Sequence, residues 1–153
     1  MLKKAQHYHA KEIVDVIKKS IFSCIADHKN NQELIDAWIA NKTEKNLKKW
    51  ILENHCYIYL LDQNIVGFYC MSPYGELFLN YVLPNFQHKK IGSQLLIKLI
   101  QDCQKYQIKK IYLESTLTAF NFYQKNYFRM TSSIKENDEI VAYAMELNNF
   151  NSI

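Results

Sequence analysis

The residues whose types and spacing best suit chemistry lie between Tyr81 and Leu96. There a strand-like run ends at Pro84, a basic loop follows, and an amphipathic helix begins. Such a junction points several unpaired backbone N–H groups and the positive end of the helix dipole at one place, which favours a bound phosphate. Lys89, Lys90 and His88 add cationic groups. We expect this loop to hold the diphosphate of a cofactor that lies along a sheet, the alternative being a plain helix start after a loop.

The elements that must position this loop can be predicted from few breakpoints, because the chain has only three glycines and two prolines. Apolar spacing predicts helices over 9–24, over 32–53 with a break near 41–43, over 91–106 and over 118–125. Strand-like runs cover 2–5, 56–61, 65–71, 76–83, 108–115, 129–134 and 140–147. Residues 26–31 are predicted to form a polar loop. The predicted order is β-α-α-β-β-β-α-β-α-β-β.

This order predicts an α+β fold, with a central mixed sheet flanked by helices. The strand, helix and strand over 76–115 indicate a right-handed parallel crossover, whereas the other strands read as antiparallel hairpins. The chain has the length of one domain, so we expect a single domain over 1–153.

Composition excludes several classes of protein. With 48% apolar and 22% charged residues the chain is predicted to be globular, and no window approaches the ~18 apolar residues of a membrane span. The first residues lack the apolar core of a signal peptide, so a cytoplasmic protein without a membrane partner is expected. The net charge of +4 comes from lysines spread over polar stripes, with Arg129 the only arginine, which disfavours a nucleic-acid partner.

The four cysteines, Cys24, Cys56, Cys70 and Cys103, lie far apart with no C-x-x-C pair. Buried free thiols are therefore expected in preference to disulfides or a zinc site. The five histidines are equally scattered. No metal site is predicted.

Three segments together resemble the GNAT superfamily of CoA-dependent N-acetyltransferases over nearly the whole chain. The strand end 81–84 is similar to the family's Y-V-x-P segment, and 87–92 is similar to its [QR]-x-x-G-x-[GA] pyrophosphate loop. Residues 116–128 resemble S-x-x-A-x-x-F-Y-x-x-x-G-F. The sequence departs from these patterns at Lys90 and Tyr127, where the family has glycine. If Lys90 needs a positive φ, it costs about 1 kcal/mol against glycine.

The resemblance implies a GNAT fold and an acyltransferase that uses acetyl-CoA as co-substrate. It implies that the amides of the loop cradle the pyrophosphate and that backbone groups at the end of the fourth strand, 76–83, pair with pantetheine. The N–H near Val82 would also stabilise the developing oxyanion. The alternatives are an ordinary strand terminus at Val82 and a helix N-cap at Thr116 or Thr118. The implied cofactor-binding residues are Val82, Leu83, Gln87, His88, Lys89, Lys90, Ile91, Gly92, Ser93, Thr116 and Tyr123.

The resemblance also implies two catalytic residues. Tyr123 matches the tyrosine that would give its proton to the departing thiolate, a step that needs a close contact because a phenol (pKa about 10) is a weaker acid than a thiol (about 8.5). Glu76 is the predicted base, and strand alternation places it on the face of Asn80 and Val82. The alternatives are a packing tyrosine, a solvated Glu76, and a base role for Glu114, Asn80 or water.

The predicted function is direct transfer of the acetyl group to a primary amine of a small molecule, peptide or protein in a ternary complex. The absence of cysteine from the motifs suits this route. The acceptor is expected to bind between residues 22–38 and the hairpin strands, where Tyr57, Tyr59, Tyr69 and Tyr74 are candidates. A monomer or a homodimer is expected. The alternative is a non-catalytic GNAT-fold module that binds acyl-CoA as a sensor or packs against a partner.

Overall fold

The computed structural model describes residues 1–148 and Phe150, and its strands form two sheets. The first has the order β1-β2-β3-β4, from β1 (Leu2–Lys4), β2 (His55–Leu61), β3 (Asn64–Met71) and β4 (Leu77–Val82). The second has the order β5-β7-β6, from β5 (Lys110–Ser115), β6 (Arg129–Glu136) and β7 (Glu139–Asn148). Neighbouring strands within each sheet are antiparallel.

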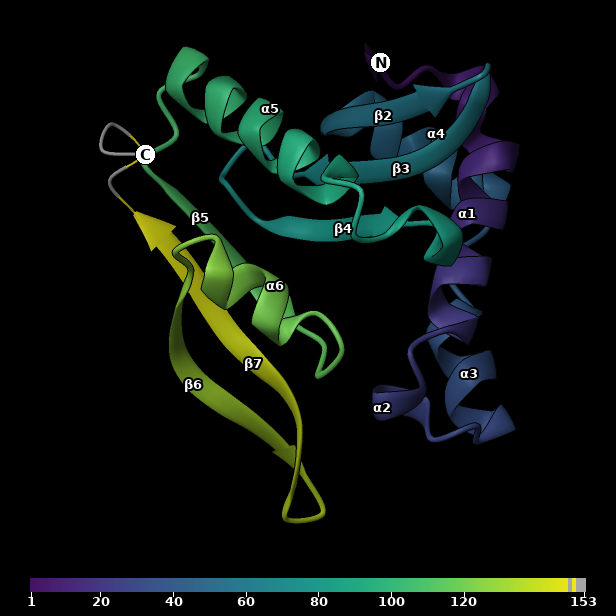
Figure 1. Cartoon of the computed structure of the whole chain (residues 1–153), viewed down its shortest axis with the longest axis vertical. Coiled ribbons are helices and arrows are strands. Elements are labelled where there is room, and N and C mark those ends of the chain that lie inside the picture. Colours follow the sequence, from purple (N-terminus) through teal and green to yellow (C-terminus); the bar gives the residue numbers. More distant parts are fainter. Residues whose placement is uncertain (149, 151–153) are drawn as a thin grey trace.

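Strands β4 and β5 run parallel and share a bridge between Glu76 and Tyr112, where the Tyr112 N–H donates to the Gly75 carbonyl at 3.0 Å. Gly75 permits this approach because its φ is +100° and a Cβ there would overlap the carbonyl of Lys110. Beyond the bridge the two strands leave in different directions (Figure 1). The predicted parallel crossover and α+β class are therefore confirmed, and the mixed sheet is divided into two along this line.

Helices cover the two faces of the first sheet. On one face lie α1 (Ala10–Phe22) and α4 (Glu44–Glu53), and on the other lies α5 (Ile91–Lys105), while α6 (Phe120–Lys125) packs beside α5 (Figure 1). Each face has its own buried cluster, and each fully buried aliphatic side chain contributes about 1.5–3 kcal/mol. The α1 cluster is centred on Ile13, Ile17, Leu47, Ile58 and Phe68, and the α5 cluster on Leu95, Leu99, Tyr69, Met71 and Ile111.

The segment between α1 and α4 is more broken than predicted. The helix expected over 9–24 is preceded by a 3-10 turn, η1 (His7–His9), and ends at Phe22. The expected loop contains a short helix, α2 (Ile25–His28). Lys29 and Asn30 then take positive φ values of 52° and 58°, which stop that helix. Beyond them, α3 (Gln32–Ile39) and α4 are separated near residue 41, as predicted.

Strand β4 contains a β-bulge. Pairing with β3 shifts between Cys70, which faces Leu79, and Met71, which faces Leu77, so Phe78 is the extra residue. In consequence Leu77 packs into the α5 cluster whereas Leu79 packs into the α1 cluster, although the two residues are two positions apart. The bulge therefore reverses which side chains of β4 face which helix layer.

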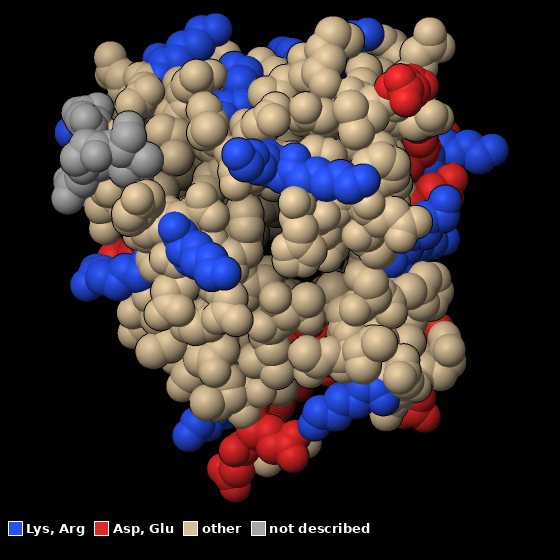
Figure 2. Space-filling model, in the orientation of Figure 1, with Lys and Arg blue, Asp and Glu red and all other residues tan. Residues whose placement is uncertain are grey.

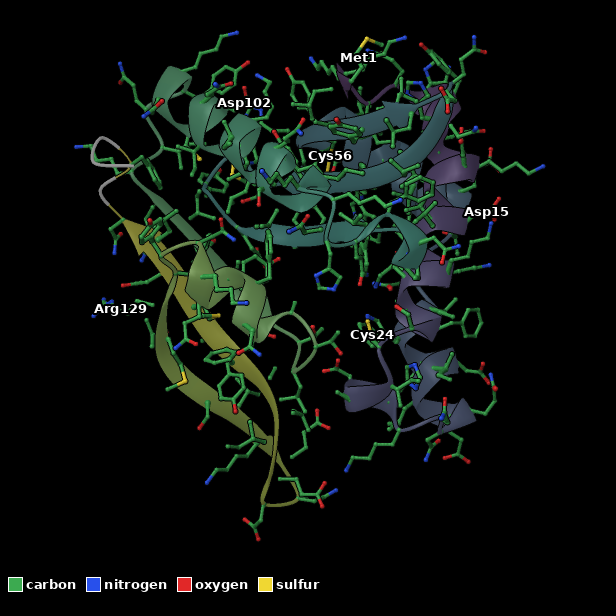
Figure 3. All side chains as sticks on the ribbon, in the orientation of Figure 1. Met1, Asp15, Cys24, Cys56, Asp102 and Arg129 are labelled. Carbon is green, nitrogen blue, oxygen red and sulfur yellow. A yellow bond between two sulfur atoms is a disulfide. The ribbon has the colours of Figure 1, made fainter. Side chains whose placement is uncertain are left out.

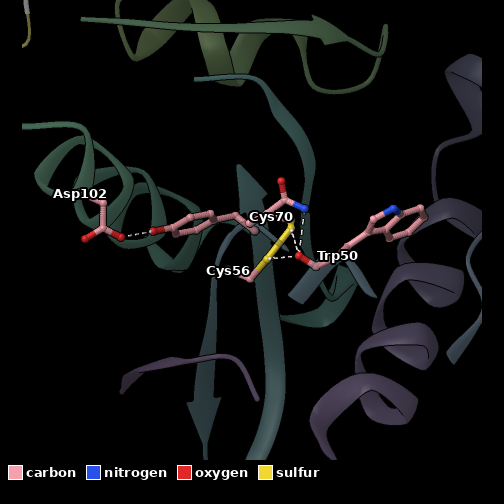
Figure 4. Close-up of a disulfide and its surroundings, with 6 residues drawn as sticks. Trp50, Cys56, Cys70 and Asp102 are labelled. Atoms are coloured by element: carbon pink, nitrogen blue, oxygen red, sulfur yellow. Dashed lines mark hydrogen bonds between the residues drawn. A yellow bond between two sulfur atoms is a disulfide. The ribbon is translucent and has the colours of Figure 1, made fainter. Parts of the chain in front are cut away.

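The prediction of free thiols is correct for Cys24 and Cys103 and wrong for Cys56 and Cys70. The antiparallel register of β2 and β3 places Cys56 directly opposite Cys70, with 4.3 Å between their Cα atoms, and the structure joins their sulfurs as a disulfide (Figure 4). Both sulfurs lie near the carbonyl oxygen of Trp50 on α4. The spacing of 14 residues along the chain gives no sign of this register.

Among the described residues, no helix has the length and apolar character needed to span a bilayer.

Candidate active site

The loop before α5 presents a set of backbone donors. It begins with a 3-10 turn, η2 (Pro84–Phe86), and within the described part of the chain the N–H groups of residues 88–93 have no hydrogen-bond acceptor. His88 and Lys90 take positive φ values of 62° and 65°, which turn the chain into the helix. The 15 residues of α5 place their positive dipole end at the same point. The loop thus has the backbone donors and the lysines that an anion site requires.

Gly92 allows α5 to approach α6 closely. A Cβ on Gly92 would lie 3.2 Å and 3.3 Å from two ring carbons of Phe122, so a side chain there would require the Phe122 ring to shift by a few tenths of an ångström. The same hypothetical Cβ would lie 3.9 Å from a methyl of Val82. The absence of a side chain at Gly92 therefore permits the close approach of the start of α5 to α6, next to the end of β4.

Among the described residues, the end of β4 is paired only with β3 and has no partner on the edge toward β5. Val82 faces Gly67 of β3, and the next N–H, that of Leu83, donates to the Val66 carbonyl at 2.8 Å. In an antiparallel ladder this pattern turns the N–H and carbonyl of Val82 away from β3, and by alternation those of Asn80 as well. The predicted Val82 donor is thus turned toward β5, whereas the predicted donor of Leu83 is used inside the sheet.

A side chain of the loop fixes the Val82 carbonyl, which accepts from Gln87 Nε2 at 3.2 Å. Ser20 Oγ of α1 lies 3.3 Å from the same oxygen, but its single proton goes to the nearer Val16 carbonyl at 2.7 Å. Gln87 therefore ties the loop back to the strand end, and Ser20 brings α1 beside the same atom. The sequence contains no motif that marks Ser20.

Tyr123 of α6 is buried, with 6% of its surface exposed, and lies between the rings of Phe122 and Phe128. Its hydroxyl accepts a hydrogen bond from Asn80 Nδ2 of β4 at 3.0 Å. Burial raises the pKa of Tyr123 to about 12, and the Asn80 hydrogen bond opposes part of that rise. The phenol is thus held next to the open edge of β4 and keeps its proton across the ordinary pH range.

The turn between β5 and α6 is held by two oxygen acceptors. Thr116 Oγ1 accepts from the Ala119 N–H at 3.1 Å within the turn that precedes α6, whose N-cap residue is Ala119 and not Thr116 or Thr118. Asp27 of α2 accepts from the N–H groups of Leu117 at 2.7 Å and Thr118 at 3.2 Å, and also from the Thr118 hydroxyl. Asp27 joins segments 90 residues apart, a link that the sequence did not indicate.

The strand-alternation argument for Glu76 is wrong. Leu77, Asn80 and Val82 all face the α5 side, because the bulge at Phe78 adds a residue between them. Alternation from Leu77 then turns Glu76 toward the opposite side, that of α1 and α4. Glu76 is exposed at the bridge where β4 and β5 meet.

Of the residues weighed against Glu76, Glu114 is exposed on β5 and Asn80 binds Tyr123. As an amide whose nitrogen donates to the phenol, Asn80 is unsuited to the role of base.

The four tyrosines that were candidates for the acceptor site lie in different surroundings. Tyr69 is buried under α5, and its hydroxyl donates to Asp102 at 3.0 Å (Figure 4). Tyr57 stacks on Tyr69 with 5.8 Å between ring centroids, and Tyr59 packs against the same cluster, because β2 and β3 direct all three to the α5 face. Tyr74 lies in the turn before β4 and is 84% exposed.

A different group of side chains lies on the α1 side of the first sheet, close to β4. Burial raises the pKa of Tyr81, and a hydrogen bond from Trp38 of α3 opposes this. Cys24 lies at the end of α1 on the side that faces α6 (Figure 3), where burial and then the charge of Asp27 raise its pKa. Tyr81, Trp38 and Cys24 thus lie between the α1–α3 segment and β4, in the region where the sequence placed the acceptor.

The charge distribution shows no single basic face in the view of Figure 2, where lysines are scattered and acidic side chains gather at the end formed by the β6–β7 hairpin. Glu139 of that hairpin pairs with Lys29 at 3.5 Å. Among residues 1–148 and Phe150, no three histidine, cysteine or acidic side chains converge as metal ligands would.

Known proteins resemble this arrangement in sequence and in structure. A family model described as an acetyltransferase (GNAT) domain matches residues 24–149. A spermidine N(1)-acetyltransferase from Thermoplasma acidophilum is 30% identical over 117 residues, which is 65% of this chain and 70% of that protein.

Solved structures show the same fold. The PaiA N-acetyltransferase of Thermoplasma acidophilum, in complex with coenzyme A, superposes with a TM-score of 0.83 at 22% identity, covering 97% of this chain and 98% of that one. A GCN5-related N-acetyltransferase from Rhodopseudomonas palustris gives a TM-score of 0.84 at 19% identity, covering 97% and 95%. Because the family model matches most of this chain, the chain belongs to the GNAT acetyltransferases and is an acyltransferase.

Proposed function

We propose that this acetyltransferase moves the acetyl group of acetyl-CoA directly to a primary amine in a ternary complex. The observation that carries the proposal is the position of the buried Tyr123 hydroxyl, 3.0 Å from Asn80 on the open edge of β4. A thioester lying along that edge would meet a backbone donor at Val82 and a proton donor at Tyr123. The first group would stabilise the developing oxyanion, and the second would protonate the departing thiolate.

The cofactor part of the site rests on the loop before α5. The N–H groups of residues 88–93 and the side chains of Lys89 and Lys90 would hold the diphosphate. The Val82 N–H, turned away from β3, would donate to the thioester oxygen as negative charge develops there, a contribution of a few kcal/mol. The coenzyme A complex of the structurally similar PaiA enzyme supports a CoA-type co-substrate.

The proposed reaction balances two proton transfers. An alkylammonium must first lose a proton, because its pKa lies near 10.4 and only the free amine attacks. A C–N bond then forms at the acetyl carbonyl, the C–S bond breaks, and Tyr123 gives its proton to the thiolate. The nitrogen of the new amide releases its extra proton, and the phenolate recovers a proton from that nitrogen or from solvent.

We propose Glu76 as the group that receives the ammonium proton, directly or through water. Alternation from Leu77 turns its side chain toward the α1 side of the sheet, whereas Tyr123 approaches from the α6 side. An acceptor entering between α1–α3 and β4 would then have the base on one side of β4 and the acid on the other.

The acceptor class is proposed as a primary amine, on a small molecule or a peptide. Spermidine is the first compound to test, because the curated relative at 30% identity is named for it. Trp38, Tyr81 and the half-exposed Cys24 supply mainly apolar contacts on the acceptor side, which suits an aliphatic chain next to the reacting nitrogen.

A two-stage experiment tests the proposal. Acetyl-CoA should raise the melting temperature, and free thiol should be released in the presence of spermidine or another primary amine. Tyr123→Phe should lower kcat strongly with little change in acetyl-CoA affinity. Stabilisation by acetyl-CoA without thiol release on a panel of polyamines, aminoglycosides and lysine peptides would contradict transfer and support the non-catalytic module instead.

A further inference from the structure

The hydroxyl of Tyr123 has a single hydrogen-bond partner within the described residues, and that partner can only donate. Asn80 Nδ2 lies 3.0 Å from the phenol oxygen. An amide NH₂ has no acceptor capacity, so the phenol oxygen accepts and its own proton points elsewhere. A phenol held in this way can release its proton without breaking the bond that positions it.

The bulge in β4 is what brings Asn80 to Tyr123. Asn80 faces Tyr69 across the β3–β4 ladder, and directly opposed residues share a face of the sheet. Without the extra residue at Phe78, alternation from Leu77 would turn Asn80 toward α1 instead. The strand therefore carries an irregularity at the position that aims one amide at one phenol.

We propose that Asn80 is a positioning residue that makes Tyr123 a better acid during acetyl transfer. The inference rests on the proposed role of Tyr123 as proton donor to the thiolate. When that proton leaves, the phenol oxygen becomes negatively charged, and the hydrogen bond from Asn80 strengthens because its acceptor is now an ion. Asn80 thus stabilises the product of proton donation more than the starting phenol.

The surroundings of Tyr123 explain why this contribution matters. Tyr123 is enclosed by aromatic rings, and burial raises its pKa to about 12 while the hydrogen bond from Asn80 opposes the rise. The half-buried Tyr81 interacts with Tyr123 and adds no compensating positive charge. Among the described residues Asn80 is therefore the donor that offsets the loss of water around the phenolate.

The kinetic test compares Asn80→Ala with Asn80→Asp. Both variants lack the amide donor, but aspartate keeps the shape of asparagine and would accept the phenol proton. We expect kcat to fall about tenfold in the alanine variant, because a hydrogen bond to a charged group is roughly twice as strong as a neutral one. The aspartate variant should fall at least as far, with KM for acetyl-CoA nearly unchanged in both. If aspartate instead retained wild-type kcat, shape alone would matter and the proposal would fail.

A matched control is Asn54→Ala. Asn54 is half-buried and donates from its side-chain amide to the Trp50 carbonyl at 2.9 Å, but it has no contact with Tyr123. The Asn54→Ala variant should lose a similar hydrogen bond without a change in kcat. In a Tyr123→Phe background, Asn80→Ala should cause no further loss, whereas a full tenfold additional loss would overturn the link between the two residues.

A spectroscopic readout separates this inference from the proposed function. A fluorotyrosine placed at position 123 lowers the phenol pKa into a range where the folded protein can be titrated by ¹⁹F NMR. Both Asn80 variants should lower the acid dissociation constant about tenfold or more, and Asn54→Ala should leave it unchanged. Equal constants in all proteins would overturn the role of Asn80. A wild-type protein inactive on every amine but showing the expected titration shift would overturn the proposed function alone.

Discussion

Replacing Lys90 by glycine should make the protein more stable and a weaker binder of acetyl-CoA. Lys90 is the N-cap of α5 and has φ 65° and ψ 8°, in the left-handed region. That conformation costs a non-glycine residue about 1–2 kcal/mol. Replacing Lys90 by glycine removes this cost, but it also makes the unfolded chain more flexible, which offsets about 0.4–1 kcal/mol of the stabilisation. The net stabilisation is about 0–1.6 kcal/mol, or up to ~6 °C in Tm for a chain of this size.

The binding effect has the opposite sign. The Lys90 side chain is exposed in the loop that would hold the diphosphate, and an exposed ion pair contributes about 0.2–1 kcal/mol. Lys90→Gly should therefore raise the Kd for acetyl-CoA by up to about fivefold at low salt, and the difference should shrink as salt increases. Thermal unfolding and titration calorimetry measure the two effects on the same preparations.

Tyr127→Gly is the matched control. Tyr127 also takes a positive φ, 71°, where the family pattern has glycine, and it is 73% exposed, so little packing is lost. The Tyr127→Gly variant should gain a similar stability. Its Kd for acetyl-CoA should be unchanged, because residue 127 lies outside the diphosphate loop. A destabilised Lys90→Gly protein, or equal Kd changes in the two variants, would refute the separation of backbone strain from charge.

Three further changes have definite expected outcomes. Gly92→Ala should weaken acetyl-CoA binding and lower Tm, because its new methyl would meet the Phe122 ring at 3.2 Å; unchanged calorimetric titrations and melts would count against this. Asp102→Ala should cost about 1–3 kcal/mol in denaturant unfolding, because it strands a buried phenol; a smaller loss would show that water reaches that site. The pH profile of kcat should rise toward alkaline pH and show no fall before about pH 11, since Tyr123 stays protonated below its raised pKa of about 12; a decline near pH 9 would point to another acid.

The elements that could be predicted are those with a regular spacing of apolar residues. The helix from Ile91 to Lys105 and the parallel crossover around it follow from apolar spacing and from the right-handed rule, and both are confirmed. The division of the sheet into two could not be predicted in this way. It depends on where β4 stops pairing with β5, and no local sequence pattern specifies that position.

The parts of the site that were missed depend on register. The bulge at Phe78 moved Glu76 to the opposite face and turned Asn80 toward Tyr123, because one inserted residue reverses every side chain on one side of it. The Cys56–Cys70 pair and the Asp27 link arise in the same way, from long-range pairing over 14 and 90 residues. The sequence motifs indicated which kinds of side chain the site contains, but the pairing register of the strands determines which of these side chains come into contact.

The unpaired edge of β4 places a strand terminus inside the protein. Exposed sheet edges are usually hazards, since another chain can add to them. Here the N–H groups of Asn80 and Val82 are turned toward β5, close to the buried Tyr123. In the proposed complex the extended, amide-bearing arm of the cofactor would pair with this edge. Binding of the cofactor would then also remove an edge to which another chain could add.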